Sequence, residues 1–128
     1  MQLEYQDSLI LSVEDDEVNS KYLERILSKA VGIRIIKAFN GKEAVHFALN
    51  NNDIKLIFMD VKMPILDGLS ATKEIKKYRP KLPIIAVTAF AMLHDRQNAL
   101  DEGCDDYISK PYETNAIYAI LEKYLTKL

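Results

Sequence analysis

Several features that mark particular protein classes are scarce in this sequence. Cys104 is the only cysteine among 128 residues, so the chain cannot form an internal disulfide bond. No apolar stretch approaches the roughly 18 residues that span a bilayer, and the N-terminus lacks the charged and then apolar segments of a signal peptide. We therefore expect a cytoplasmic chain, or the cytoplasmic part of a membrane-bound parent, that does not itself contact the membrane.

An excess of charge of either sign is also absent. The 17 Lys and Arg residues are spread along the chain and balanced by 19 Asp and Glu residues, which gives a formal net charge of -2. Proteins that bind nucleic acid usually concentrate basic residues on one face. The charge pattern therefore argues against direct binding of DNA or RNA.

Apolar residues, by contrast, make up 48% of the sequence, and a chain of this length can bury roughly two-thirds of its unfolded surface in one domain. Five short runs rich in Ile, Val and Leu are mostly continuous rather than alternating. Such runs are typical of strands buried on both faces of a parallel sheet, and they cover residues 9–13, 33–38, 55–59, 84–88 and 106–109. Amphipathic segments that indicate helices follow each of them, at about 17–30, 41–50, 68–78, 91–102 and 114–126.

The order of these elements predicts the fold class. A strand and a helix repeated five times, with right-handed crossovers, form a doubly wound α/β domain, and the commonest five-stranded parallel order is the flavodoxin-like 2-1-3-4-5. We place this single domain at residues 9–128, after an N-terminal extension at 1–8. Ligands of such a sheet bind beyond the carboxyl ends of the strands, at the point between strands 1 and 3.

Acidic residues follow two of the predicted strands at that edge. Glu14, Asp15 and Asp16 come after the first strand, and Asp60 ends the third. Two carboxylates about 4 Å apart repel by about 4 kcal/mol at an effective dielectric constant of 20, so such a cluster needs a cation. Mg²⁺, which prefers carboxylate and phosphate oxygens, is the natural candidate. Taken alone, Asp15, Asp16 and Glu17 could equally cap the first predicted helix, but their coincidence with Asp60 favours a metal site.

A hydroxyl and an ammonium group are predicted at the same edge. Thr88 ends the fourth predicted strand, and Lys110 follows the fifth. A carboxylate can attack phosphorus to give an acyl phosphate, while a metal, a lysine and a hydroxyl stabilise the charge on the phosphoryl oxygens. These residues predict phosphoryl transfer with Asp60 as the nucleophile. The nearby Asp67-Gly68 is expected to form a turn and a helix start rather than a ligand, and the glycine would permit a positive φ.

Two other kinds of site use similar residues, and the sequence departs from both. A haloacid-dehalogenase-type phosphatase has a second Asp two residues after its nucleophile, where this chain has Lys62. A calcium loop that began at Asp15 would need Gly at its sixth position and Glu at its twelfth, where the chain has Ser20 and Ile26.

Four segments resemble the receiver domain of two-component response regulators, the family of the chemotaxis regulators. They are V-E-D-D-E-V-N at 13–19, F-M-D-V-K-M-P-I-L-D-G at 58–68, V-T-A at 87–89 and Y-I-S-K-P-Y at 107–112. The resemblance covers nearly the whole chain and is strongest to the receivers of hybrid sensor histidine kinases. It implies a domain that takes a phosphoryl group from a histidine kinase or a histidine phosphotransfer protein. Such a domain is not an enzyme by itself, although it assists its own phosphorylation and dephosphorylation.

The resemblance also assigns metal and acceptor roles to individual residues. It implies that Asp60 accepts the phosphoryl group and that Asp15 and Asp60 bind Mg²⁺ directly. Glu14 would act through water, and Lys62 would contribute its backbone carbonyl.

Further roles implied by the resemblance concern the fourth and fifth strands. Thr88 and Lys110 would contact the phosphoryl group, and Tyr107 would be the aromatic switch that reorients when Thr88 moves. The peptide bond between Lys110 and Pro111 would be cis. The positions that tune the lifetime of the acyl phosphate would be Lys62 and Phe90.

Two origins for the domain fit the sequence. It is either a receiver cut from a hybrid histidine kinase, which the runs at 14–19 and 103–111 favour, or a free-standing regulator. A degenerate receiver that only binds other proteins is a third reading, but it fits poorly because every acidic, hydroxyl and lysine position is present. No effector module follows the fifth predicted helix, so we expect the output to come through protein contacts.

Overall fold

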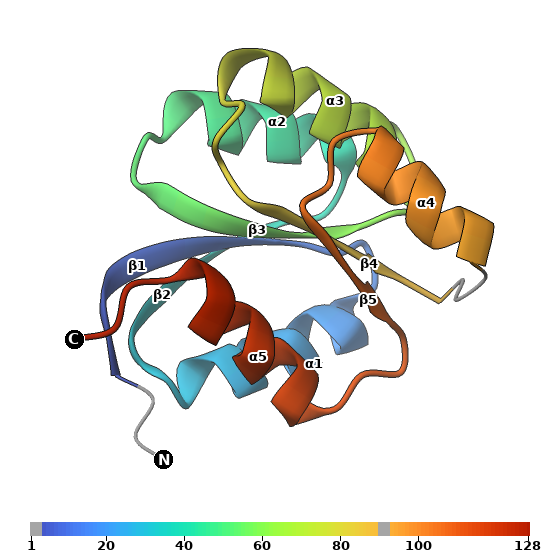
Figure 1. Cartoon of the computed structure of the whole chain (residues 1–128). Coiled ribbons are helices and arrows are strands. Elements are labelled where there is room, and N and C mark those ends of the chain that lie inside the picture. The colour runs from blue at the N-terminus through green and yellow to red at the C-terminus, as the bar shows by residue number, and fades with distance from the viewer. Residues whose placement is uncertain (1–3, 90–92) are drawn as a thin grey trace.

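The computed structural model describes residues 4–89 and 93–128, and within them strands and helices alternate as the apolar pattern predicts (Figure 1). The strands are β1 (Glu4–Val13), β2 (Val31–Ala38), β3 (Ile54–Asp60), β4 (Ile84–Thr88) and β5 (Asp106–Ser109). The helices are α1 (Glu17–Ser28), α2 (Gly41–Asn50), α3 (Gly68–Tyr78), α4 (Leu93–Asp101) and α5 (Thr114–Tyr124). Among these described helices, none combines the length and the apolar character needed to cross a bilayer.

The strands form one parallel sheet in the order β2-β1-β3-β4-β5, which confirms the predicted doubly wound fold. Helices α1 and α5 cover one face of this sheet, and α2, α3 and α4 cover the other (Figure 1). The sheet is therefore the middle layer of three, and its carboxyl edge remains open for a site.

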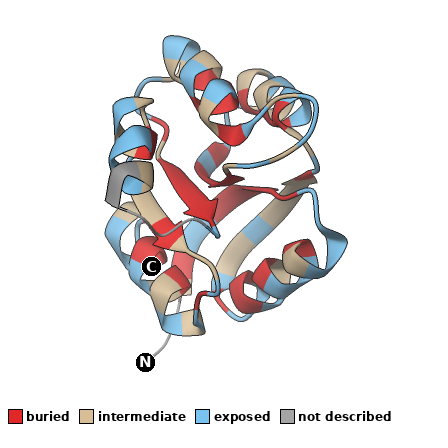
Figure 2. Ribbon diagram, turned by 90° about the vertical axis from the view of Figure 1, so that its right-hand side faces the viewer, coloured by how far each residue is buried: buried red, intermediate tan, exposed pale blue. Residues whose placement is uncertain are grey.

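Each face of the sheet carries its own apolar core. Alternate strand residues such as Ile10 and Phe58 pack against α1 and α5, whereas Leu11 and Ile57 pack against α2, α3 and α4. Strand β4 is buried along its whole length, which explains why its sequence is continuously apolar. The buried residues gather in the strands and on the inner sides of the helices (Figure 2).

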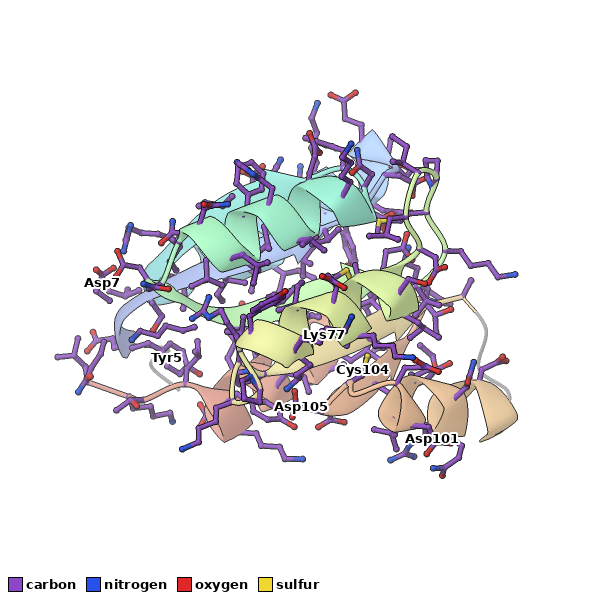
Figure 3. All side chains as sticks on the ribbon, turned by 90° about the horizontal axis from the view of Figure 1, so that it is seen from above. Tyr5, Asp7, Lys77, Asp101, Cys104 and Asp105 are labelled. Atoms are coloured by element: carbon purple, nitrogen blue, oxygen red, sulfur yellow. The ribbon has the colours of Figure 1, made fainter. Side chains whose placement is uncertain are left out.

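Strand β1 is longer than predicted, and residues 4–8 are not an extension outside the domain. Tyr5 is fully buried, and the chain from Glu4 onward belongs to the sheet. The C-terminal residues lie beside it: the amide of Gln6 donates to the carbonyl of Thr126 at 3.0 Å, and Tyr5 forms an antiparallel bridge with Lys127. Tyr5 and Asp7 mark this end of the molecule in Figure 3, and the C-terminal residues lie beside the start of β1 in Figure 1. Because residues 6–8 are polar, the apolar pattern did not indicate this part of the strand. Helix α5 ends at Tyr124 rather than at residue 126, because the residues that follow pair with β1.

Candidate metal and phosphoryl site

The predicted carboxylates meet at the carboxyl edge of the sheet, the edge that faces the viewer in Figure 2. Glu14 follows β1 and Asp60 ends β3, and these two strands pair directly. Glu14, Asp15 and Asp60 can each offer one carboxylate oxygen such that all three oxygens lie within 4.8 Å of one another. Asp16 is not part of this group. Its side chain caps α1, because it accepts hydrogen bonds from the amides of Val18 and Asn19 at 2.8 and 3.2 Å.

Lys110 brings the ammonium group that the sequence predicts. Its Nζ lies 2.5 Å from Oε1 of Glu14 and 3.7 Å from Oδ1 of Asp60. Its backbone amide donates to the carbonyl of Thr88 at 2.7 Å, which fixes the start of the loop after β5. The lysine therefore spans the two buried carboxylates but is bonded more closely to Glu14.

The positive charge in the site does not balance the negative charge. Glu14 and Asp60 are only 6% and 7% exposed, and Asp15 is exposed beside them. Burial, and after it the neighbouring Glu14, raise the pKa of Asp60 to about 8. Burial also acts to raise the pKa of Glu14, but hydrogen bonds from Asp60 and Lys110 outweigh it and hold that pKa below its usual value. One carboxylate of the pair thus keeps a proton at neutral pH unless a cation compensates its charge.

This arrangement fits a magnesium ion. The donors are carboxylate oxygens, two of the three carboxylates are buried, and burial and the neighbouring Glu14 raise the pKa of Asp60. Mg²⁺ commonly binds through one or two carboxylates and keeps several waters. Glu14, Asp15 and Asp60 are therefore the residues that would hold it.

Gly68 is needed in the loop after Asp60, but for a different reason than predicted. Gly68 does not use the positive φ that a glycine permits, because the glycines with positive φ in the described residues are Gly32 and Gly103. A Cβ at Gly68 would instead lie 2.0 Å from the backbone carbonyl oxygen of Asp60. Asp67 caps α3 by accepting a hydrogen bond from the amide of Ser70 at 2.9 Å, as expected for a helix start.

A cavity of about 370 Å³ lies beside the carboxylates, between the loop after β3 and helix α4. Thr88 is buried at the end of β4 and lines this cavity together with Lys62, Asp67 and Asp95. The structure thus brings Thr88 and Lys62 to the same edge as Asp60. Phe90 lies outside the described residues.

Tyr107 and Pro111 complete the predicted set. Tyr107 lies half-buried on β5 against the core under α2, α3 and α4, and its buried hydroxyl finds no hydrogen-bond partner within the described part of the chain. The peptide bond between Lys110 and Pro111 is cis.

The sequence did not point to one contact at this edge. Tyr22 on α1 donates a hydrogen bond from its hydroxyl to the backbone carbonyl of Tyr112 at 3.0 Å, and the two rings lie 5.5 Å apart. The residues are far apart in the chain and neither belongs to a charge or metal motif. No sequence signal could have paired them.

Comparisons with known proteins agree with this geometry. The model of the response regulator receiver domain matches residues 10–122. Hybrid signal transduction histidine kinase G of Dictyostelium discoideum is 40% identical over 124 residues, which are 93% of this chain but only 4% of that protein. The polar-differentiation response regulator DivK of Brucella anthropi is 39% identical over 118 residues, which cover 91% of this chain and 94% of that protein. The chain therefore matches a small part of the kinase and nearly all of the regulator.

Solved structures of similar domains are also close in shape. The receiver domain of the sensor histidine kinase PA1611 from Pseudomonas aeruginosa, with a magnesium ion coordinated in its active site cleft, has a TM-score of 0.84. It is 38% identical, and the match covers 91% of this chain and 96% of that one. The receiver domain of Ssk1 from Saccharomyces cerevisiae, in a co-crystal with the histidine phosphotransfer protein Ypd1, has a TM-score of 0.86 at 30% identity, over 94% of this chain and 90% of that one. Because the family model spans most of a chain whose sheet order and strand-end carboxylates were established independently, this chain belongs to the response regulator receiver domain family.

Proposed function

We propose that this receiver domain of a two-component phosphorelay takes a phosphoryl group from a phosphohistidine onto Asp60, with Mg²⁺ held by Glu14, Asp15 and Asp60. The observation that carries the proposal is the state of Asp60. It is a buried carboxylate at a strand end, its pKa is raised to about 8, and the one ammonium group beside it bonds more closely to Glu14. A buried carboxylate whose charge is poorly compensated lowers the stability of the fold. Such residues are therefore typical of functional sites.

The chemistry is a displacement at phosphorus. An oxygen of Asp60 forms a new P–O bond while the P–N bond of the phosphohistidine breaks, and the imidazole nitrogen keeps the electron pair and takes up a proton. Bound Mg²⁺ supplies the positive charge that keeps Asp60 ionised and offsets the charge of the phosphoryl oxygens. Lys110, 3.7 Å from Asp60, can donate to a phosphoryl oxygen from one side, and Thr88 can donate its hydroxyl from the other. The backbone carbonyl of Lys62 would complete the oxygen ligands.

The donor is a protein rather than a small molecule. Large apolar side chains are exposed on three segments at the carboxyl edge of the sheet, namely at Val18 and Tyr22 of α1, Phe39 after β2 and Ile65 after β3. An exposed apolar surface around a reactive group is typical of a protein-binding site. The co-crystal of the Ssk1 receiver with the phosphotransfer protein Ypd1 supports a histidine phosphotransfer protein or a histidine kinase as the partner.

The proposal also covers the parent protein of the domain and the surface that responds to phosphorylation. We favour a hybrid histidine kinase as the parent and a cytoplasmic location, and the match to DivK supports a free-standing regulator as the alternative. Phosphorylation would act on the surface of α4, β5 and α5 through Thr88 and Tyr107. The lifetime of the aspartyl phosphate would depend on Lys62 and Phe90. The domain would serve as the phosphoacceptor and would not turn over a substrate of its own.

Incubation with phosphoramidate and Mg²⁺ tests the proposal. Intact mass spectrometry should show the gain of one phosphoryl group by the wild-type domain and none by Asp60→Asn. Asp53→Asn, which changes an exposed carboxylate, should be labelled like the wild type. Chelation of the metal by EDTA should suppress the labelling. Equal labelling of Asp60→Asn and wild type would show that the acceptor is another residue, and a wild-type domain that gains no mass would support the reading as a protein-binding module only.

A further inference from the structure

The loop that carries Lys110 is tied to helix α1 by a residue outside the predicted site. Tyr22 Oη lies 3.0 Å from the backbone carbonyl oxygen of Tyr112, two residues after Lys110, and the two aromatic rings are 5.5 Å apart with an angle of 33° between their planes. We propose that Tyr22 is a positioning residue that keeps Lys110 within reach of the phosphoryl group on Asp60. This inference rests on the proposed function and adds to it a role for α1.

The loop between β5 and α5 is also held by the ring of Tyr112, which is buried in the core under α1 and α5, but its backbone has few hydrogen bonds. The amide of Lys110 bonds to the carbonyl of Thr88, but Pro111 has no amide hydrogen to donate. Glu113 precedes α5 without a side-chain capping hydrogen bond. The bond from Tyr22 therefore orients the backbone in the middle of the loop, where the buried ring of Tyr112 anchors the side chain.

Two hydrogen bonds attach this loop to the β1–α1 unit. The ammonium of Lys110 bonds to Glu14 at 2.5 Å, and the carbonyl of Tyr112 accepts from Tyr22. Movement of the ammonium from Glu14 toward a phosphoryl group on Asp60 breaks the first attachment and leaves the second. The bond from Tyr22 is therefore most important for the position of Lys110 during phosphoryl transfer. Neither Tyr22 nor Tyr112 is a metal ligand.

The expected effect is moderate. Tyr22 is 44% exposed, so water can partly replace the hydrogen bond that its hydroxyl donates to the loop. Removal of one neutral hydrogen bond with the ring retained should slow phosphorylation by about three- to tenfold. Loss of the whole ring would also remove the contact with Tyr112, so Tyr22→Phe is the informative variant.

A double-mutant cycle tests the inference with small-molecule phosphorylation of the whole chain. The rate of labelling by phosphoramidate at saturating Mg²⁺ is measured for wild type, Tyr22→Phe, Lys110→Ala and the double variant. Tyr22→Phe should be three- to tenfold slower than wild type, and it should change the rate by less than about twofold once Lys110 is absent. Tyr78→Phe, which alters an exposed tyrosine at the opposite end of the sheet, should behave like wild type.

Two further measurements separate positioning from a loss of stability. The affinity for Mg²⁺ by calorimetry should be the same for Tyr22→Phe and wild type, because Tyr22 is not a metal ligand. In ¹³C NMR spectra with Mg²⁺ and beryllofluoride, a mimic of the phosphoryl group, the shift of the Lys110 ¹³Cε signal should be reduced in Tyr22→Phe and unchanged in Tyr78→Phe. This readout remains available where Lys110→Ala reacts too slowly to be timed.

The outcomes distinguish the two proposals. If wild type is labelled and Tyr22→Phe reacts at the same rate, the role of Tyr22 is wrong and the proposed function stands. The role is also wrong if Tyr22→Phe slows labelling by the same factor with and without Lys110. It is wrong as well if beryllofluoride shifts the Lys110 ¹³Cε signal equally in Tyr22→Phe and wild type. If wild type is not labelled at Asp60, the proposed function fails and the role of Tyr22 fails with it.

Discussion

Asp60 sits in a place where its negative charge is poorly compensated. It is buried beside Glu14, and the nearest ammonium group, on Lys110, is 3.7 Å away and bonded to Glu14. The position of Asp60 at a strand end was readable from the sequence, because topology brings the ends of β1 and β3 together. The sharing of charge between Asp60, Glu14 and Lys110 was not readable, because it depends on distances of a few ångströms.

The free energy of unfolding of the metal-free domain should therefore depend on Asp60 and on pH. The pKa of this carboxyl is about 8 in the folded state against 3.8 ordinarily, so between these pH values the folded state holds a proton that the unfolded state has lost. Stability from this group is present in full below pH 4 and falls as the pH rises toward 8. Asp60→Asn should remove this fall. At pH 8 its free energy of unfolding should exceed that of wild type by at least about 1 kcal/mol.

Urea unfolding in EDTA at pH 5 and pH 8 measures this difference. The advantage of Asp60→Asn should be larger at pH 8 than at pH 5, whereas Asp53→Asn, an exposed control, should show no such change. A constant difference between wild type and Asp60→Asn across the two pH values would contradict the assigned charge state.

Ile65 is the residue with the least favourable backbone in the described chain. Its φ is 72°, and the amide of Leu66 bonds back to the carbonyl of Pro64 at 2.8 Å, which makes a strained γ-turn. A branched side chain disfavours this conformation, and Ile65 is 76% exposed, so burial does not offset the cost. This strain could not be predicted from the sequence, because isoleucine is not a residue that predicts a positive φ.

Ile65→Asn should raise the free energy of unfolding by about 0.5–1 kcal/mol, since asparagine tolerates a positive φ. Val18→Asn is a matched control, because Val18 is equally exposed but lies in α1, where valine and asparagine have similar helix propensity. Urea unfolding should show a gain for Ile65→Asn and not for Val18→Asn. An Ile65→Asn domain no more stable than wild type would mean that the turn is not strained.

The strands and helices were predictable from the sequence where one local pattern determines the element. Buried parallel strands such as β4 read as apolar runs, and helix starts such as Asp67-Gly68 read as caps. The prediction was poorest where two segments distant in sequence meet. Gly68 illustrates this, because its role depends on the approach of α3 to the backbone of Asp60 and not on its own φ.

Gly68→Ala should therefore lower the free energy of unfolding by about 1–3 kcal/mol, because the added Cβ meets a carbonyl oxygen of the backbone that cannot simply rotate away. It should also slow phosphoryl uptake, since the backbone that must shift belongs to Asp60. Lys73→Ala, on the exposed side of the same helix, should change stability by no more than about 0.5 kcal/mol. Urea unfolding and phosphoramidate labelling of both variants check this, and a fully stable and active Gly68→Ala domain would contradict it.

At the scale of the whole molecule, the two ends of the described chain stabilise each other. Tyr5 is fully buried, its hydroxyl donates to Glu122 at 3.2 Å, and the backbone of Glu4 accepts from the amide of Leu128 at 3.1 Å. Burial and then Glu122 raise the pKa of Tyr5 to about 12. Sheet order and layering were predictable from the alternation of elements, but this closure was not, because the residues after Tyr5 are polar.

Tyr5→Ala should lower the free energy of unfolding by about 3–5 kcal/mol, as for other buried aromatic residues, whereas Tyr5→Phe should cost only about 0.5–1.5 kcal/mol for the lost hydrogen bond. Tyr78→Ala, at an exposed tyrosine, provides the comparison. Thermal and urea unfolding measure all three. If Tyr5→Ala is as mild as Tyr78→Ala, residues 4–8 do not belong to the folded domain.

In the proposed function, Asp60 carries the phosphoryl group. Treatment of the phosphorylated domain with borohydride reduces an aspartyl phosphate to homoserine, which peptide mass spectrometry can locate. We expect homoserine at position 60 in the domain labelled in the presence of Mg²⁺, and none in samples with EDTA. Homoserine at another aspartate, with position 60 unchanged, would contradict the account.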